Sequence, residues 1–554
     1  MHSRILIHQK PAWYLFTGFA VLLLLHVAFL FCGFYGNDDI NYARHAGELL
    51  HTGSLSFTDG DHFRLRWTSI FVTALFYKIF GVTAFASSLF SYFSFALTAW
   101  LICLLLKKEP ARLLLLAYAM FFLSFTVIFY AHRLLPDAGV CLFVFAAYFF
   151  YHRKRFNNAP DLTYAAFFAL ALFLAMITKE TVIITAPLWI FLLINDMAAK
   201  RNGRFWKTAL GLLVALTGLY LLYFELSQGD WLFRYHVFNN HSERHFDGIT
   251  YQRLGYIALA KRLAYQLWEA FLFNGDFEYL IFAVGAFVYR RKVFPGEASR
   301  HIAISFIILL LSANFMSYSI NGYNPLWPDP RHFIFIAPFA VIPGAYMLNA
   351  YFKNPSSYIL ILVLFLLADA WLFLSEIGNT KYVYLLITFF LGLRLVNQYF
   401  PLRVLSDNWL IAGWIAAMSL NYINDIIRPR YPYYFDQQAI VKRHFPDLSR
   451  EAIVYSGDAL TAEMSDFFLA FKNEKTRFVN IHEIENFDAG INDKYLLING
   501  GYNSFFKQKA DSLLSIDLYR SDVDPLQQES DVILYKIRDT AILRPLKIFS
   551  TNKL

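Results

Sequence analysis

Long hydrophobic stretches dominate the chain from residue 12 to residue 424. A helix of about 20 apolar residues is long enough to cross a bilayer. The pattern predicts about thirteen such spans, at residues 12–33, 84–106, 112–131, 136–151, 162–178, 181–197, 207–225, 266–289, 302–319, 332–350, 357–375, 382–400 and 407–424. Because lipid cannot satisfy free backbone groups, this pattern predicts a polytopic α-helical membrane protein.

Two shorter patterns lie in residues 34–83, between the first two predicted spans. Residues 43–51 carry apolar side chains on one helical face and charged ones on the other, which predicts a helix on the membrane surface. Residues 67–80 are apolar but too short for a span, so we predict a re-entrant or interfacial segment. If they crossed the membrane, every later connection would change sides.

The hydropathy drops after residue 425 and stays low. Short β-like runs at 452–455, 478–481, 495–498 and 532–535 alternate with helical stretches at 460–472 and 504–515. This predicts two domains: a transmembrane domain over residues 1–428 and a small C-terminal α/β domain over residues 429–554.

The charge pattern predicts an orientation. Charged residues make up 16% of the chain, against about 25% in soluble proteins. Lys and Arg gather on alternate connections, at 107–108, 152–155, 200–207 and 290–292. Positive loops face the cytoplasm, so the net charge of +8 indicates a multi-pass protein of the cytoplasmic (inner) membrane rather than a nucleic-acid surface. The N-terminus is then cytoplasmic and the C-terminal domain extracytoplasmic. The three cysteines lie in apolar runs and indicate neither disulfides nor a metal site.

Adjacent carboxylates at the mouth of the first span are the main candidates for catalysis. Asp38 and Asp39 follow directly on the apolar run, where an ionised group is costly without water or a partner. A carboxylate there suits a general base, and we assign that role to Asp38. The alternative is that Asp39 caps the surface helix. Asp137, at the start of a later span, is the third candidate.

Several polar residues in the predicted outer connections are candidates for binding a phosphate or the rest of a substrate. Arginine pairs bidentately with phosphate oxygens, and lysine contributes a positive charge. The alternative is that these residues anchor the chain at the headgroups or extend towards water from the ends of spans. They are His62, Arg64, Arg66, Arg133, Lys179, Glu180, Arg331 and His332.

A metal site has weaker support in the sequence. His241 and His245 have i,i+4 spacing with Glu243 between them, a set that can hold a divalent ion. Such spacing also arises by chance in a polar loop. The sequence therefore indicates no certain cofactor, and a divalent metal is left as an alternative.

The motif Asp38-Asp39-Ile40-Asn41-Tyr42-Ala43 resembles the acidic motif in the first outer loop of GT-C-fold glycosyltransferases of the protein O-mannosyltransferase and aminoarabinose-transferase type. Further similarities follow in the same order: residues 74–81 ending in Phe-Gly, residues 132–137 ending in Asp, Lys179 at a hairpin, and Arg331-His332 opening a late span. The sequence departs from the family pattern at Asp39, which replaces the commoner Glu, at Asn41, and at residues 64–67.

The resemblance implies a GT-C-like fold and transfer of a hexosyl or pentosyl group from a polyprenyl-phosphate donor to a hydroxyl of a lipid, glycan or protein. It implies inversion at the sugar and a substrate-binding role for Tyr42. The alternative from another class is a transporter or flippase of lipid-linked sugars. A transporter places ionisable groups near the bilayer midplane and often shows repeats, whereas here the charges cluster at span ends and no repeat is visible.

Overall fold

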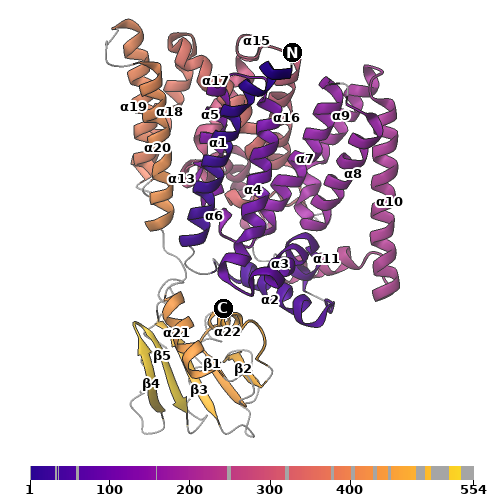
Figure 1. Ribbon diagram of the computed structural model, residues 1–554, viewed down its shortest axis with the longest axis vertical. Coiled ribbons are helices and arrows are strands. Elements are labelled where there is room, and N and C mark those ends of the chain that lie inside the picture. Colours follow the sequence, from indigo (N-terminus) through magenta and orange to yellow (C-terminus); the bar gives the residue numbers. More distant parts are fainter. Residues whose placement is uncertain are drawn as a thin grey trace.

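The computed structural model describes most of the chain. The described residues are 2–30, 34, 36–57, 61–157, 159–245, 251–318, 323–375, 380–400, 406–427, 433–446, 451–473, 475–481, 493–500 and 523–537. The helical part and the sheet are stacked along the longest axis of the molecule (Figure 1).

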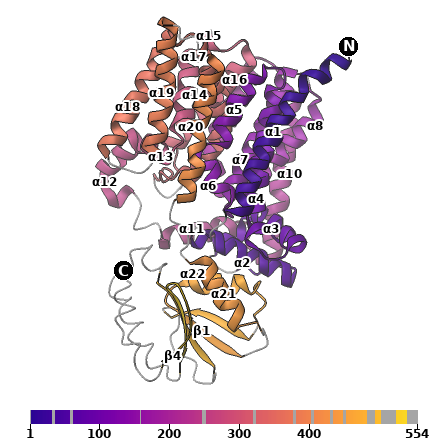
Figure 2. The ribbon, with the colours of Figure 1, turned by 60° about the vertical axis from the view of Figure 1, so that its left-hand side comes forward.

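Helices packed side by side form the larger part (Figures 1 and 2), and each of the thirteen predicted spans overlaps a helix or a pair of helices. They are α1 (His2–Phe29), α4 (Ala84–Leu106), α5 (Ala111–Phe122), α6 (Phe125–Ala131), α7 (Pro136–Asn157), α8 (Asp161–Thr178), α9 (Ala186–Ala198), α10 (Gly203–Gln228), α13 (Leu267–Asn274), α14 (Phe277–Val288), α16 (Glu297–Phe315), α17 (Ala337–Lys353), α18 (Ile359–Ser375), α19 (Thr380–Tyr399) and α20 (Asp407–Ile427). Among the described residues, seven helices are long and apolar enough to cross a membrane, or eight if the bent pair α5–α6 is one span. The fold is therefore that of a polytopic helical membrane protein.

Two predicted spans are broken, and the breaks lie against each other. The pair α5–α6 bends by 59° beside Ser124, whose side chain caps α6. The second break, between α13 and α14, is at Gly275, with φ 83°. Asp276 accepts a hydrogen bond from the backbone N of Thr126 at 3.2 Å, and Asn421 of α20 donates to the carbonyl of Leu123 at 2.8 Å. Side chains thus form hydrogen bonds with backbone groups that have lost their helical partners at the breaks.

Shorter helices lie across one end of the bundle (Figure 1). They are α2 (Asn37–Thr52), the 3₁₀ turn η1 (His62–Leu65), α3 (Trp67–Phe80) and α11 (Phe233–His245). The helix α2 buries Ala43 and Ala46, as its amphipathic pattern predicts. The apolar helix α3 packs on α2. Connecting elements are η2 (Glu180–Thr185), α12 (Tyr251–Lys261), η3 (Arg262–Gln266), α15 (Arg290–Val293), η4 (Pro330–Ile336) and η5 (Pro355–Tyr358).

The C-terminal part contains a five-stranded mixed sheet in the order β2-β1-β3-β5-β4. Strands β1 (Ala452–Ser456), β2 (Thr476–Asn480) and β3 (Lys494–Asn499) are parallel, and β5 (Val532–Ile537) pairs antiparallel with β3. These four strands and α22 (Ala459–Phe468) overlap the predicted elements; α21 (Tyr434–His444) precedes them. The pattern does not predict β4 (Val523–Glu529) because it contains Pro525, which a strand tolerates at an edge. The predicted helix 504–515 lies outside the described residues.

The C-terminal domain contacts α2 directly. Arg44 of α2 lies 3.5 Å from Glu463 of α22, and the ring of His51 hydrogen-bonds to the carbonyl of Ala470 at 2.8 Å. A Cβ added to Gly47 would collide with the ring of Phe471, so any larger residue here would force that ring or the backbone to move. The surface helix is thus held between the bundle and the domain.

Candidate functional site

Polar side chains from distant parts of the chain meet at the end of the bundle where α2 lies. The extended residue Lys179 separates α8 from η2 and faces the start of α7. The 3₁₀ turn η4 opens at Pro330 and is capped by Asp329, which accepts a hydrogen bond from the backbone N of Arg331 at 3.0 Å. The ends of these helices therefore bring the side chains of Lys179 and Arg331 to the same end of the bundle.

Asp38 and Arg331 form the first pair of the site. Nη1 of Arg331 lies 2.9 Å from Oδ2 of Asp38, and Nε lies 3.3 Å from Asp329. Burial disfavours ionisation of Asp38, but Arg331, Arg66 and Lys179 outweigh it and hold the pKa of Asp38 below its usual value. The side chain is still 41% exposed, so an ionised carboxylate is open to an incoming molecule.

Lys179, Asp137 and His332 form a second, buried group. Nζ of Lys179 lies 2.5 Å from Oδ1 of Asp137 and 3.2 Å from Nδ1 of His332. Burial, together with Arg66 and Arg331, lowers the pKa of Lys179, and Asp137 partly opposes that change. The ammonium is thereby fixed in position beside the first pair.

Arg66 connects the site to α11. Its guanidinium donates to the hydroxyl of Tyr42 and lies 3.3 Å from Glu180. Burial disfavours the charge on Arg66, but Tyr42 and Glu180 stabilise it and the pKa is raised. The other oxygen of Glu180 is 3.1 Å from Arg234. The sequence pattern did not single out Arg234, because it lies in α11 with no motif around it.

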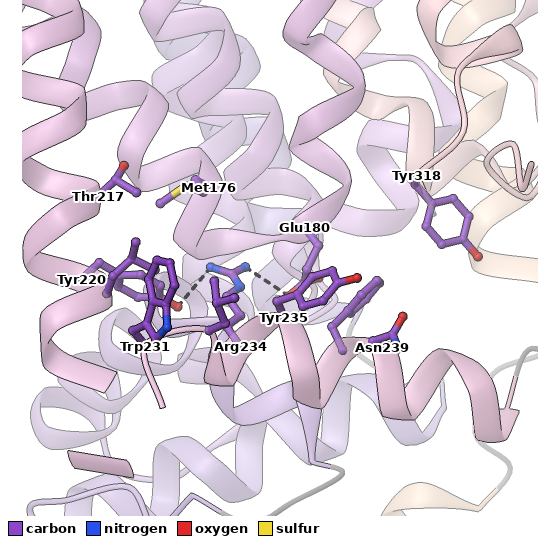
Figure 3. A pocket seen from close by; sticks show the side chains of 12 residues that line it. Met176, Glu180, Thr217, Tyr220, Trp231, Arg234, Tyr235, Asn239 and Tyr318 are labelled. Carbon is purple, nitrogen blue, oxygen red and sulfur yellow. Dashed lines mark hydrogen bonds and ion pairs between the residues drawn. The ribbon is translucent and has the colours of Figure 1, made fainter. Parts of the chain in front are cut away.

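A mostly apolar cavity of about 280 Å³ opens beside this last pair. Figure 3 shows Arg234 between Tyr220 and Glu180 in the cavity wall, and Arg234 donates to the hydroxyl of Tyr220 at 3.2 Å. Trp231 and Tyr235 also line it. The site therefore combines fixed cations with an adjoining apolar space.

Two predicted residues lie apart from this group. The N-cap residue of α2 is Gly36, and the carboxylate of Asp39, in the first turn, accepts a hydrogen bond from the backbone N of Gly36 at 3.1 Å. Arg64 lies 3.0 Å from Glu48 and 2.9 Å from Asp61, in a separate cluster beside α2.

Other predicted residues have different positions. His62 is buried in η1 and its ring lies against Phe63. The buried guanidinium of Arg133 lies over the ring of Phe129, 4.8 Å from its centroid. The predicted metal ligands His241, Glu243 and His245 have side chains outside the part of the chain that the structure describes. Among described residues, one set of three side chains has mutually close metal-ligating atoms: His26, His132 and Asp425.

No protein-family model matches the sequence, and no curated protein matches it. Solved structures of similar fold include two of the same protein. ArnT from Cupriavidus metallidurans bound to undecaprenyl phosphate has 13% identity and a TM-score of 0.59, and covers 96% of this chain and 98% of its own. The apo structure of the same protein has 12% identity and a TM-score of 0.58, with the same coverage. The likeness confirms the predicted GT-C-like helical membrane fold.

Proposed function

We propose that this protein is a membrane glycosyltransferase that moves a sugar from a polyprenyl-phosphate donor to a hydroxyl of a lipid, glycan or protein. One observation carries the proposal: Asp38 lies among Arg66, Lys179 and Arg331 at one end of a GT-C-type bundle. The ArnT structure with undecaprenyl phosphate supports the class of donor.

The donor's phosphate would bind among the three cations. As the sugar leaves, the bond from its anomeric carbon to the phosphate oxygen breaks and the electron pair stays on the phosphate. Fixed cations at that point stabilise the growing negative charge more than water does. Lys179 and Arg66 are held by Asp137 and Glu180, so they need little reorganisation. The apolar cavity beside Arg234 would receive the first isoprene units of the lipid.

Asp38 would be the general base. Its partial exposure lets an acceptor hydroxyl approach, and the carboxylate takes the hydroxyl proton as the oxygen attacks the sugar. One displacement with one base inverts the anomeric centre. Asp137 is buried against Lys179, so we assign it a positioning role instead.

We place this end of the bundle, with the C-terminal domain, on the outer face of the cytoplasmic membrane, and the N-terminus inside. Positive loops at the opposite helix ends support this orientation. The test is protease added to intact spheroplasts: cleavage within residues 429–554 is expected, whereas cleavage only after lysis would overturn the orientation.

The position of the charges argues against the transporter alternative. A transporter binds its substrate near the bilayer midplane. Here the cluster lies beside α2 and α11, which cross one end of the bundle (Figure 1).

Lipid binding tests the proposed donor site. The full-length protein in nanodiscs would be examined by native mass spectrometry with undecaprenyl phosphate and with undecaprenol, which lacks the phosphate. We expect selective binding of the phosphate lipid, reduced about tenfold or more by Lys179→Met. Arg64→Met removes a cation outside the site and should leave binding unchanged. Equal binding of both lipids, or equal losses in both variants, would overturn the assignment.

A further inference from the structure

A second group of ionisable side chains lies at the ends of three helices, apart from the proposed transferase site. His26 comes from the last turn of α1, His132 follows α6, and Asp425 lies near the end of α20. All three side chains are buried, with His26 3%, His132 1% and Asp425 0% exposed. Neither the acidic motif nor the proposed sugar transfer gives them a role.

Their ligating atoms are close enough to share one ion. Nε2 of His26 lies 2.9 Å and Nε2 of His132 lies 3.9 Å from Oδ2 of Asp425. One ligating atom from each of the three residues lies within 4.8 Å of the other two. Tetrahedral zinc with bonds of about 2.0–2.1 Å separates its ligand atoms by roughly 3.4 Å. The two distances to Asp425 fall on either side of that value, so shifts of under about 1 Å would complete the geometry.

The environment of His26 also indicates a ligand. Neither of its ring nitrogens makes a hydrogen bond within the part of the chain that the structure describes, although Nε2 is close to the carboxylate. A buried imidazole without a hydrogen bond is costly. The rings of His26 and His132 are stacked, with centroids 5.1 Å apart, so the group offers imidazole nitrogens from two residues and the carboxylate oxygens of a third.

We propose that His26, His132 and Asp425 bind a zinc ion or a similar first-row divalent metal. Two imidazoles and one carboxylate form a common zinc ligand set, and a water molecule would supply the fourth ligand. The ring of Tyr422 packs edge-on against His26 at 5.1 Å. Its hydroxyl is buried and makes no hydrogen bond to the described residues, so it is available as a partner for such a water.

The ion would link the ends of three helices. It would tie α20, the last helix before the C-terminal domain, to α1 and to the end of α6. His132 directly precedes Arg133 and the turn into α7, where Asp137 contacts Lys179. Metal binding would therefore fix both the exit of the C-terminal domain and one wall of the proposed transferase site.

Metal content of the full-length purified protein tests the site. After incubation with zinc and removal of excess, mass spectrometry of the metal should give about one ion per chain. His26→Gln and Asp425→Asn should each lose it. His301→Gln is the matched control: His301 is also buried, but it hydrogen-bonds to Tyr148 on α7, and it should retain the ion. Equal zinc content in all four proteins, or none in the wild type, would overturn the proposal.

Cobalt provides a readout that needs no variant to fold. Co²⁺ replacing zinc in a site with two imidazoles should give visible d–d absorption bands of tetrahedral coordination, and zinc should displace them. Absence of these bands in the wild-type protein would count against the site. The result is independent of sugar transfer, since neither measurement uses a donor or an acceptor.

Discussion

Arg331 and Asp38 are 293 positions apart in the chain, yet Nη1 of the arginine lies 2.9 Å from Oδ2 of the aspartate. The contact joins the turn that opens α17 to the first turn of α2. It gives the carboxylate a cationic neighbour while leaving it partly exposed. The contact of Asp38 and part of the lowering of its pKa therefore come from a residue in the far half of the chain.

Asp38→Asn should abolish most transfer, because an amide cannot accept the acceptor's proton. We expect the rate of transfer to fall roughly 10²- to 10⁴-fold, the usual contribution of a general base. The measurement is the yield of glycosylated lipid or protein in membranes by mass spectrometry, with inserted protein quantified. Asp39→Asn is the matched control, since its amide oxygen can still accept the hydrogen bond from the backbone N of Gly36, and it should change transfer only slightly. Transfer by Asp38→Asn at the wild-type rate would remove the base assignment.

The acid limit of transfer should depend on Arg331. In the proposed mechanism transfer requires ionised Asp38, and the neighbouring cations hold its pKa below its usual value despite burial. Protonation of Asp38 should therefore not reduce the wild-type rate between about pH 7 and pH 5. Arg331→Gln removes a cation and should raise the pKa of Asp38. The acid limb of the pH–rate profile should then move to higher pH.

Arg64→Gln is the control for that profile, because Arg64 pairs with Glu48 and Asp61 outside the site. Its acid limb should match the wild type. If Arg331→Gln lowers the rate equally at every pH, Arg331 acts on binding alone and does not tune Asp38.

Much of the fold could be predicted because a bilayer-length apolar run has few structural options. The breaks in the helices of the bundle could not be predicted, since they depend on contacts between distant residues. Ser124 and Gly275 are unremarkable in sequence, and only the packed bundle brings their backbones together beside Asn421 of α20. The edge strand β4 was missed because Pro525 is unfavourable in a strand whose neighbours are unknown.

The candidate site could be predicted in outline only. Charges at span ends are conspicuous, and the structure brings Asp38, Lys179 and Arg331 together. The sequence could not show which of two nearby arginines lies in the site. Arg64 and Arg66 are two residues apart and have different partners. Such choices depend on the turn η1 and not on residue type.

Asp196 should contribute strongly to the stability of the protein. It pairs with α7 near the end of that helix that lies away from the candidate site. It is fully buried, forms an ion pair with Arg155, and accepts hydrogen bonds from Asn202 and Trp206 at 2.9 Å each. Asp196→Ala removes the buried partner of Arg155 and leaves it only the exposed carboxylate of Glu297 at 3.6 Å, which should cost about 3–5 kcal/mol. Thermal unfolding in detergent measures the loss, with the exposed Glu225→Ala as control. Equal melting temperatures would show that Arg155 finds another partner.

Docking of the C-terminal domain on α2 should depend on the absence of a side chain at Gly47. A leucine there would collide with Phe471, and Gly47→Leu should separate α22 from α2. A short thiol crosslinker between Arg44→Cys and Glu463→Cys, whose native side chains are 3.5 Å apart, measures docking in a background without native cysteines. We expect the crosslinked fraction to fall several-fold with Gly47→Leu and to recover when Phe471→Ala is added, because the smaller side chain removes the overlap.

Gly211→Leu is the matched control for that experiment. This glycine lies in α10 with open space around it, so the same substitution should leave crosslinking unchanged. Efficient crosslinking in Gly47→Leu would show that Phe471 moves aside without cost. A loss that Phe471→Ala does not restore would show that leucine disturbs α2 itself. Recovery only in the double variant would assign the docking to this one contact between helix and domain.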